Sequence, residues 1–147
     1  MLYSLAGKIV GRKENCAIIE AGGIGFKVLL SQRAAQSLPQ NGSDIKIFCS
    51  LYSRESAPFE LFGFLNEQEL YLFEKLNTVS GVGPKTALSV MGIAPTDQLI
   101  AAINSGKTDL LTKASGIGKK TAERVVLDLK GKLDGGSKEA SAQNLSL

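Results

Sequence analysis

Apolar and polar residues alternate along short segments in the first part of the chain. In DIKIFCSLY (44–52), every second residue from Ile45 to Leu51 is apolar, which is the two-residue period of a strand with one buried face. Turn residues such as the Gly22-Gly23 pair separate the segments. We predict strands over 2–10, 15–21, 24–30, 44–52 and 59–64, with one helical turn over 33–38. Five short strands with such an insertion predict a closed β-barrel of the OB type.

The pattern becomes helical after residue 65. In NEQELYLFEKLNTV, Leu70, Phe73 and Leu76 recur at helical spacing. Asn66, followed three residues later by Glu69, forms a capping-box pattern that predicts where this helix begins. Further helices are predicted after Pro84, over 96–104, near 109–113 and over 119–133.

The strand pattern of the first part and the helical pattern of the second predict an α+β chain with two domains. We expect an OB-type five-stranded barrel over 1–64 and an all-α domain over 65–134. The small and polar residues of 135–147 are typical of a flexible linker. The N-terminus has no basic start followed by a long apolar stretch, so we expect no secretory signal, and no apolar run is long enough to cross a bilayer.

One motif occurs twice in the helical part. SGVGPKTALSV (80–90) is followed 35 residues further on by SGIGKKTAERV (115–125). Each copy lies between two helical stretches and has two glycines around one apolar residue. Glycine can adopt positive φ and lets another group approach the backbone closely. The next helix then begins with N–H groups that lack partners beside the positive end of its dipole, which is an anion site suited to phosphate.

The residues around the two loops suit binding to a nucleic-acid backbone. Backbone amides, lysines and threonine hydroxyls contact phosphates without reading base sequence, and two copies can hold both strands across one minor groove. Residues 111–132 carry six basic and two acidic side chains, which favours an anion at this place. The candidate DNA-binding residues are Gly81, Val82, Gly83, Lys85, Thr86, Gly116, Ile117, Gly118, Lys119, Lys120, Thr121 and Arg124.

Composition argues against most catalytic and metal chemistry. The chain has no histidine, which excludes His-based triads, His general bases and His metal ligands. We predict that Cys16 and Cys49 are reduced, buried packing residues, with a single disulfide between them as the alternative. A nucleotide-binding P-loop requires G-x-x-x-x-G-K-[ST], and neither loop has that spacing. We therefore expect no cofactor, no metal and no catalytic residue.

The duplicated loop resembles the helix-hairpin-helix motif of DNA-binding proteins. SGVGPKTAL and GIGKKTAERVVLDLK, combined with EAGGIGFKV and ELFGF in the barrel, are similar to the RuvA family of Holliday-junction-binding proteins from residue 1 to about 133. The resemblance implies a cytoplasmic, non-enzymatic homotetramer, sometimes paired into an octamer, that opens four-way junction DNA into a square. It also implies work with the RuvB ATPase and the RuvC resolvase in recombination, DNA repair and the SOS response.

The resemblance also implies an acidic pin between the last two barrel strands. That loop reads SRESAPFE here, so Glu55 matches, whereas Ser56 stands where the family usually has a second acid. The pin would repel phosphates and keep strands apart at the crossover. The family continues through a linker into a small RuvB-binding domain, and this chain stops inside the linker. From this we expect junction binding with poor coupling to the motor.

Three other functions remain open at this point. A generic duplex-binding hairpin module would bind phosphates without preferring a junction. A glycosylase or nuclease on a hairpin scaffold would need a carboxylate cluster or a base pocket, and Asp97, Asp109 and Glu123 form no evident cluster. A single-strand-binding barrel would need exposed stacking aromatics, whereas we expect the aromatics of the barrel to face its core. These are Phe26, Tyr52, Phe59, Phe62 and Phe64.

Overall fold

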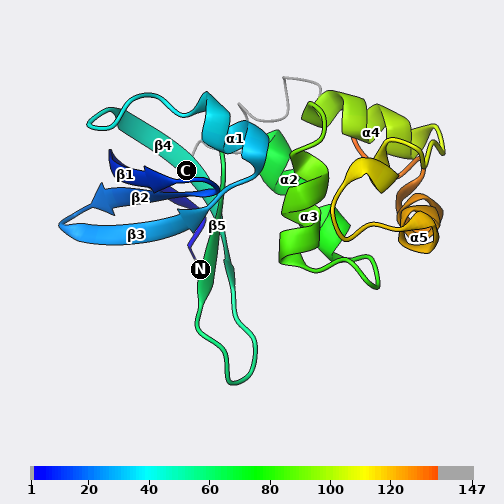
Figure 1. The fold of residues 1–147 in the computed structure, drawn as a ribbon, viewed down its shortest axis with the longest axis horizontal. Helices are drawn as coiled ribbons and strands as arrows, with labels where there is room; N and C mark the ends of the chain where they lie inside the picture. The colour runs from blue at the N-terminus through cyan, green and yellow to red at the C-terminus, as the bar shows by residue number, and fades with distance from the viewer. Residues whose placement is uncertain (1, 136–147) are drawn as a thin grey trace. The chain divides into compact units, whose positions relative to one another are not determined.

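The computed structural model describes residues 2–135 and divides into two compact units. The first ends at Leu70 and the second begins at Tyr71, so the boundary falls inside one helix. Figure 1 shows the strands in the first unit and short helices joined by tight loops in the second. Apart from Gly135, the expected linker over 135–147 lies outside the described residues, as does any domain beyond it.

The first unit is the predicted five-stranded closed barrel. Its strands are β1 (Ser4–Lys13), β2 (Cys16–Ala21), β3 (Ile24–Leu29), β4 (Asp44–Tyr52) and β5 (Glu60–Phe64), with α1 (Gln32–Ser37) between β3 and β4. The barrel closes in the order β1-β2-β3-β5-β4, with β1 antiparallel to β4 and β3 parallel to β5. The α+β class and the barrel are confirmed.

Alternate residues of the strands fill the barrel. Ile19, Val28 and Ile47 are fully buried, as the period of two requires. Space is tight at Gly63 of β5, where an added Cβ would collide with the side chains of Val28 and Ile47. Glycine at this position of ELFGF therefore leaves room for two core side chains to pack against the backbone.

The barrel corrects two sequence predictions. The prediction that β1 spans 2–10 was wrong, because Arg12 and Lys13 continue to pair with β2 up to a tight turn. The prediction that Phe59 faces the core was also wrong, since its side chain is 71% exposed. Phe59 precedes the first ladder pair of β5, Tyr52 with Glu60, so no strand pairing directs it inward.

Cys16 and Cys49 are free thiols. Cys49 is buried, whereas Cys16 is only half-buried, so the expectation of burial holds for one of the two. Desolvation by burial raises the pKa of the Cys49 thiol to about 11, so it stays protonated at neutral pH and behaves as a packing residue.

The second unit consists of short helices around a separate core. They are the part of α2 (Glu67–Asn77) from residue 71 onward, α3 (Pro84–Met91), α4 (Thr96–Asn104), the 3₁₀ turn η1 (Leu111–Lys113) and α5 (Lys119–Leu129). Phe73, Leu76, Leu99 and Ile103 are fully buried, which is the apolar stripe expected from their spacing. Among the described residues, no single helix is long and apolar enough to cross a bilayer, and α3 with α4 passes only as a pair bent by 104°.

The start of α2 matches the predicted capping box, with one difference. The Glu69 N–H donates to Asn66 Oδ1 at 2.9 Å, as expected for an N-cap. The Glu69 carboxylate accepts from the N–H of Leu65 at 2.9 Å, one residue earlier than the usual reciprocal bond. Two N–H groups at the start of the helix are therefore satisfied by side chains.

The end of α5 differs from the prediction. The helix stops at Leu129 rather than 133, because Gly131 adopts a φ of +72° and the chain turns there. Asn104, at the end of α4, holds this turn: its Oδ1 accepts from the N–H groups of Gly131 (3.0 Å) and Leu133 (3.4 Å), and its Nδ2 donates to the Leu133 carbonyl (2.9 Å).

Candidate nucleic-acid interface

The two copies of the motif have the same backbone conformation. Gly81 and Gly116 take φ values of +88° and +84°, which side-chain-bearing residues rarely adopt. Gly83 and Gly118 are the N-caps of α3 and α5, with φ, ψ of −87°, 177° and −90°, 179°. The first glycine of each pair therefore makes the turn, and the second begins the helix in an extended conformation.

The residue between the glycines packs inward. Val82 and Ile117 are 5% and 6% exposed, so their side chains belong to the core of the second unit. Their N–H groups donate to the carbonyls of Val79 (3.1 Å) and Ala114 (3.3 Å), which closes a tight turn in each loop. Of the twelve predicted contact residues, these two therefore present neither a side chain nor their own amide to a ligand.

The N-termini of α3 and α5 have features that suit an anion. No side chain caps either helix, and the first hydrogen bonds of the helices are Ala87 N–H to Gly83 and Ala122 N–H to Gly118, each 2.9 Å. The N–H groups of the first turn lie before these bonds and beside the positive dipole end. Because the N-caps are glycines, a phosphate can approach these amides without meeting a side chain at that position.

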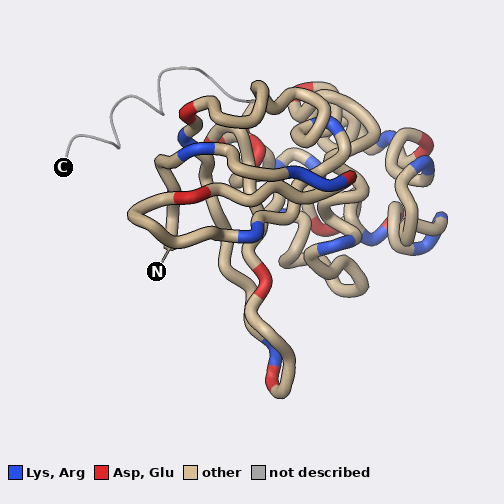
Figure 2. The backbone as a smooth tube through the Cα atoms, turned by 60° about the vertical axis from the view of Figure 1, so that its left-hand side comes forward, with Lys and Arg blue, Asp and Glu red and all other residues tan. Residues whose placement is uncertain are grey.

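Basic side chains surround both N-termini. Lys85 lies at the second position of α3, and Lys119 and Lys120 are the first two residues of α5; all three are exposed. Figure 2 shows several Lys and Arg positions along the helical part of the chain. Each helix start therefore combines amide donors with positive charge, the pairing that suits phosphate oxygens.

The remaining predicted residues differ in their surroundings. Thr86 and Thr121, both half-buried, lie in the first turns of α3 and α5. Arg124 is exposed on α5, where its Nε lies 3.3 Å from Asp128 Oδ2, an i,i+4 ion pair on the helix surface. The Arg124 charge is thus partly compensated by a carboxylate on its own helix. DNA contact by any of the twelve residues stays a prediction.

The loop between β4 and β5 extends away from the barrel (Figure 1). Glu55 is exposed near its tip, where Ala57 N–H donates to the Arg54 carbonyl at 3.2 Å and Ser56 adopts a φ of +63°. The guanidinium carbon of Arg54 lies 5.5 Å from the centroid of the Tyr52 ring. The loop therefore places one acid and one base side by side at its end, as the charge colouring of Figure 2 shows.

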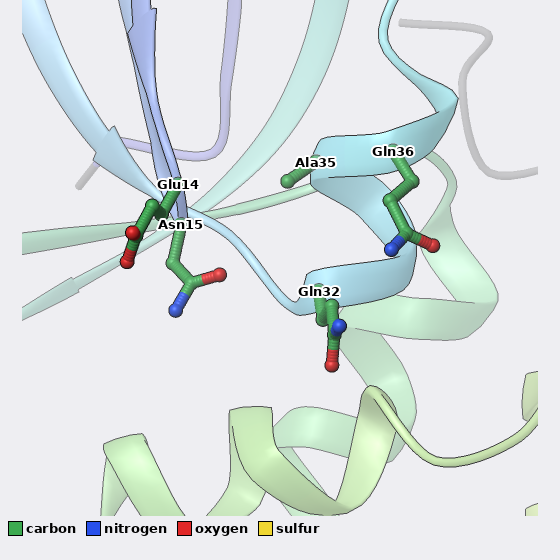
Figure 3. A pocket seen from close by; sticks show the side chains of 5 residues that line it. All are labelled: Glu14, Asn15, Gln32, Ala35 and Gln36. Carbon is green, nitrogen blue, oxygen red and sulfur yellow. The ribbon is translucent and has the colours of Figure 1, made fainter.

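The described residues offer little for catalysis. No group of three or more His, Cys, Asp or Glu side chains within residues 2–135 could hold a metal ion. A polar pocket of about 430 Å³ lies on the barrel unit, between the β1–β2 turn and α1. Figure 3 shows the side chains that line it. Glu14 is its one acidic lining residue, and amides supply most of the rest: Asn15, Gln32 and Gln36. It contains no nucleophile next to a base.

Two long-range contacts that position the hairpins were not predicted from the sequence. Asn104 ties the end of α4 to the residues that follow α5, across 27 to 29 positions in sequence. Thr86 packs against Gly116 of the other hairpin, where an added Cβ would lie 3.3 Å from its Oγ1. Both contacts are long-range, and no local pattern in the sequence signals them.

Comparison with known proteins assigns both units. The family model for the RuvA N terminal domain matches residues 1–63, and the model for the SAM-like helix-hairpin-helix tandem matches residues 73–131. The first match covers the barrel, and the second covers both hairpins.

Curated relatives match along most of the chain. The Holliday junction branch migration complex subunit RuvA of Caldanaerobacter subterraneus subsp. tengcongensis is 49% identical over 133 residues, which are 90% of this chain and 71% of that protein. The subunit of the same name from a Thermoanaerobacter species is 44% identical over the same shares. That from Actinobacillus pleuropneumoniae serotype 5b is 41% identical over 135 residues, 92% of this chain and 67% of that protein. Barrel, paired hairpins and these relatives together place the chain in the RuvA family.

Proposed function

We propose that the chain is the DNA-binding subunit of a Holliday junction branch migration complex. It binds four-way junction DNA by shape and through phosphates, without reading sequence, and serves recombination and repair. The observation that carries this is the pair of matching helix N-termini, at Gly83 and Gly118, which are free of side-chain caps and flanked by lysines. The names of the relatives supply the particular DNA structure.

The subunit itself is not the motor. The ATP-driven step belongs to a separate protein, RuvB, which we propose as partner. The two glycine loops lack the spacing of a P-loop, and neither follows a strand. The protein positions the DNA, because its amides and lysines bind the phosphates of the junction arms. Base pairs can therefore be exchanged between the arms while the phosphate contacts stay the same.

We further propose that the subunits assemble into a homotetramer in the cytoplasm and that RuvC acts on the same junction. Residues 1–64 would form the assembly domain, and residues 65–134 the DNA-binding domain. Support for assembly comes from large apolar side chains on the barrel unit that are about half exposed or more: Tyr3, Val10, Ile24, Leu51 and Phe59. In a fourfold assembly, Glu55 would repel phosphates at the crossover as a pin, although Arg54 beside it weakens the net negative field.

A competition gel shift tests the proposed function. The chain is bound to a labelled four-way junction at about physiological salt and challenged with unlabelled junction, linear duplex or single strand of the same sequence. We expect the junction to compete best. Equal competition by junction and linear duplex would leave a generic duplex binder and overturn the proposal. Cleavage of the labelled junction in Mg²⁺ would show an enzyme instead.

A further inference from the structure

The two hairpins match in backbone but not in their surroundings. A Cβ added at Gly116 would lie 3.3 Å from Thr86 Oγ1 and 3.6 Å from Thr86 Cγ2. A Cβ added at Gly81, the equivalent glycine of the first hairpin, would meet nothing within 4 Å. The threonine of the first hairpin therefore packs near Gly116 of the second, whereas no atom of Thr121 comes within 4 Å of the equivalent Cβ position at Gly81.

We infer that Thr86 is a positioning residue that sets the separation of the two phosphate-binding helix N-termini. This rests on the proposed function. It replaces the sequence-based expectation that Thr86 contacts DNA with a role inside the protein, and it leaves Thr121 as the threonine that donates to a phosphate. The first turn of α3, which contains Thr86, lies against the turn at Gly116, three residues before α5 begins. A side chain between these two elements fixes the spacing of the anion sites at their ends.

Spacing matters because both sites must engage one DNA backbone surface at once. Once the first site is bound, binding at the second is intramolecular, and the benefit is lost when the geometry does not fit. The branched shape of Thr86 supplies this spacing, since Oγ1 and Cγ2 are its two atoms nearest to the position that a Cβ would take at Gly116. Two features favour glycine at position 116: its φ is +84°, and an added Cβ would crowd the side chain of Thr86.

This role makes a prediction that a phosphate-donating hydroxyl does not. Thr86→Val removes the hydroxyl but keeps the branched shape, whereas Thr86→Ala removes both branches. We expect Thr86→Val to bind the junction within about twofold of the parent. Thr86→Ala should bind about fivefold more weakly, an effect within the range reported for residues that couple two sites without touching the ligand. Thr121→Val is the matched control, and there we expect weaker binding because the proposed role of Thr121 is to donate its hydroxyl to a phosphate.

A double-mutant cycle then tests the contact itself. Gly116→Ala should weaken binding, and Thr86→Ala in the same chain should recover part of that loss, because the atoms at 3.3 and 3.6 Å are gone. Gly81→Ala introduces an equivalent φ strain and is the control: Thr86→Ala should not rescue it. Denaturant melts give the free energy of unfolding of each variant. These values form a second double-mutant cycle, which measures the coupling between Thr86 and Gly116 in the absence of DNA.

Two outcomes would overturn the inference. If Thr86→Val loses as much affinity as Thr86→Ala, the hydroxyl acts on DNA and shape is not its role. If neither variant changes binding, the contact does not set the spacing. Failure of the proposed function is separate: the parent would then show no junction preference, while the coupling between Thr86 and Gly116 would still appear in the unfolding free energies.

Discussion

Four glycines in the hairpins serve two different physical purposes. Gly81 and Gly116 have positive φ, so replacing them strains the backbone by an amount on the order of 1 kcal/mol in addition to any effect on DNA. Gly118 has a φ of −90°, which any residue adopts, and an added Cβ there meets no protein atom within 4 Å. Gly118 is therefore the position where a side chain can be added to the phosphate site without disturbing the fold.

Gly118→Ala should weaken junction binding while leaving the fold unchanged. We expect a loss of about tenfold, which corresponds to one hydrogen bond to a charged group, because the new methyl group stands between the phosphate and the first turn of α5. The free energy of unfolding should stay within about 0.5 kcal/mol of the parent. Fluorescence anisotropy with labelled junction gives the first quantity, and a urea melt gives the second.

Gly135→Ala is the control for this substitution, since it also adds a methyl group at an exposed glycine with nothing within 4 Å. It should leave both quantities unchanged. Unaltered affinity in a folded Gly118→Ala variant would mean that phosphates do not approach the start of α5.

At the scale of elements, the sequence predicted the limits of a helix or strand correctly where residues in or next to that element determine them. The strand over 44–52 and the helix over 96–104 have the predicted limits, because alternation fixes the first and Pro95 with Gly106 bounds the second. The repeat predicted both hairpin loops. The end of α5 was mispredicted because a side chain of α4, Asn104, takes over the backbone groups that the next turn would have used.

The sequence could not predict the packing of Thr86 on Gly116 or the exposure of Phe59, and the physical reason is the same for both. Both depend on which segments meet in three dimensions or on where a ladder begins, and the residues themselves carry no signal of it. Periodicity reports the buried face of an element, and it does not report which neighbouring element covers that face.

Asn104→Ala should loosen the end of α5. It removes the hydrogen bonds to Gly131 N–H, Leu133 N–H and the Leu133 carbonyl, so we expect a loss of about 1–2 kcal/mol in the free energy of unfolding. Asn104→Asp keeps an oxygen acceptor for the two N–H groups and should lose less. Thermal or urea melts measure both variants. Equal stability of Asn104→Ala and the parent would show that the clamp does not contribute.

Glu69→Gln should change how stability depends on pH. Desolvation by burial raises the pKa of the Glu69 carboxyl above its ordinary value of 4.5, and the Leu65 N–H and Arg33 offset this only in part. The folded state thus holds this proton to a higher pH than the unfolded state does. The Glu69 contribution to stability is therefore fully present below about 4.5 and is lost as pH rises through the folded-state pKa.

The glutamine side chain does not titrate in this range. The free energy of unfolding of the parent, relative to that of Glu69→Gln, should therefore fall as pH rises from 4 to 7. Urea melts across that range measure it, with Glu74→Gln as a control at an exposed position of the same helix. A difference that stays constant with pH would contradict the assignment.

At the scale of the whole molecule, affinity should depend steeply on salt. Each phosphate neutralised contributes a slope of about −0.9 to log affinity against log salt, so two hairpins contacting one phosphate each predict about −1.8 or steeper per subunit. Lys119→Gln with Lys120→Gln should make the slope shallower by about 0.9, the share of the one phosphate assigned to the second hairpin. Lys107→Gln, at an exposed lysine outside the hairpins, should leave the slope unchanged. A slope near zero in the parent would rule out binding through phosphates.

The most direct test of the account is a hydroxyl-radical footprint of the protein on a four-way junction, with linear duplex alongside. The account predicts protection in all four arms, at equal distances from the crossover and on both strands facing one minor groove, and the same pattern on junctions of unrelated sequence. Protection that ignores the crossover, or that follows the sequence from one junction to another, would contradict it.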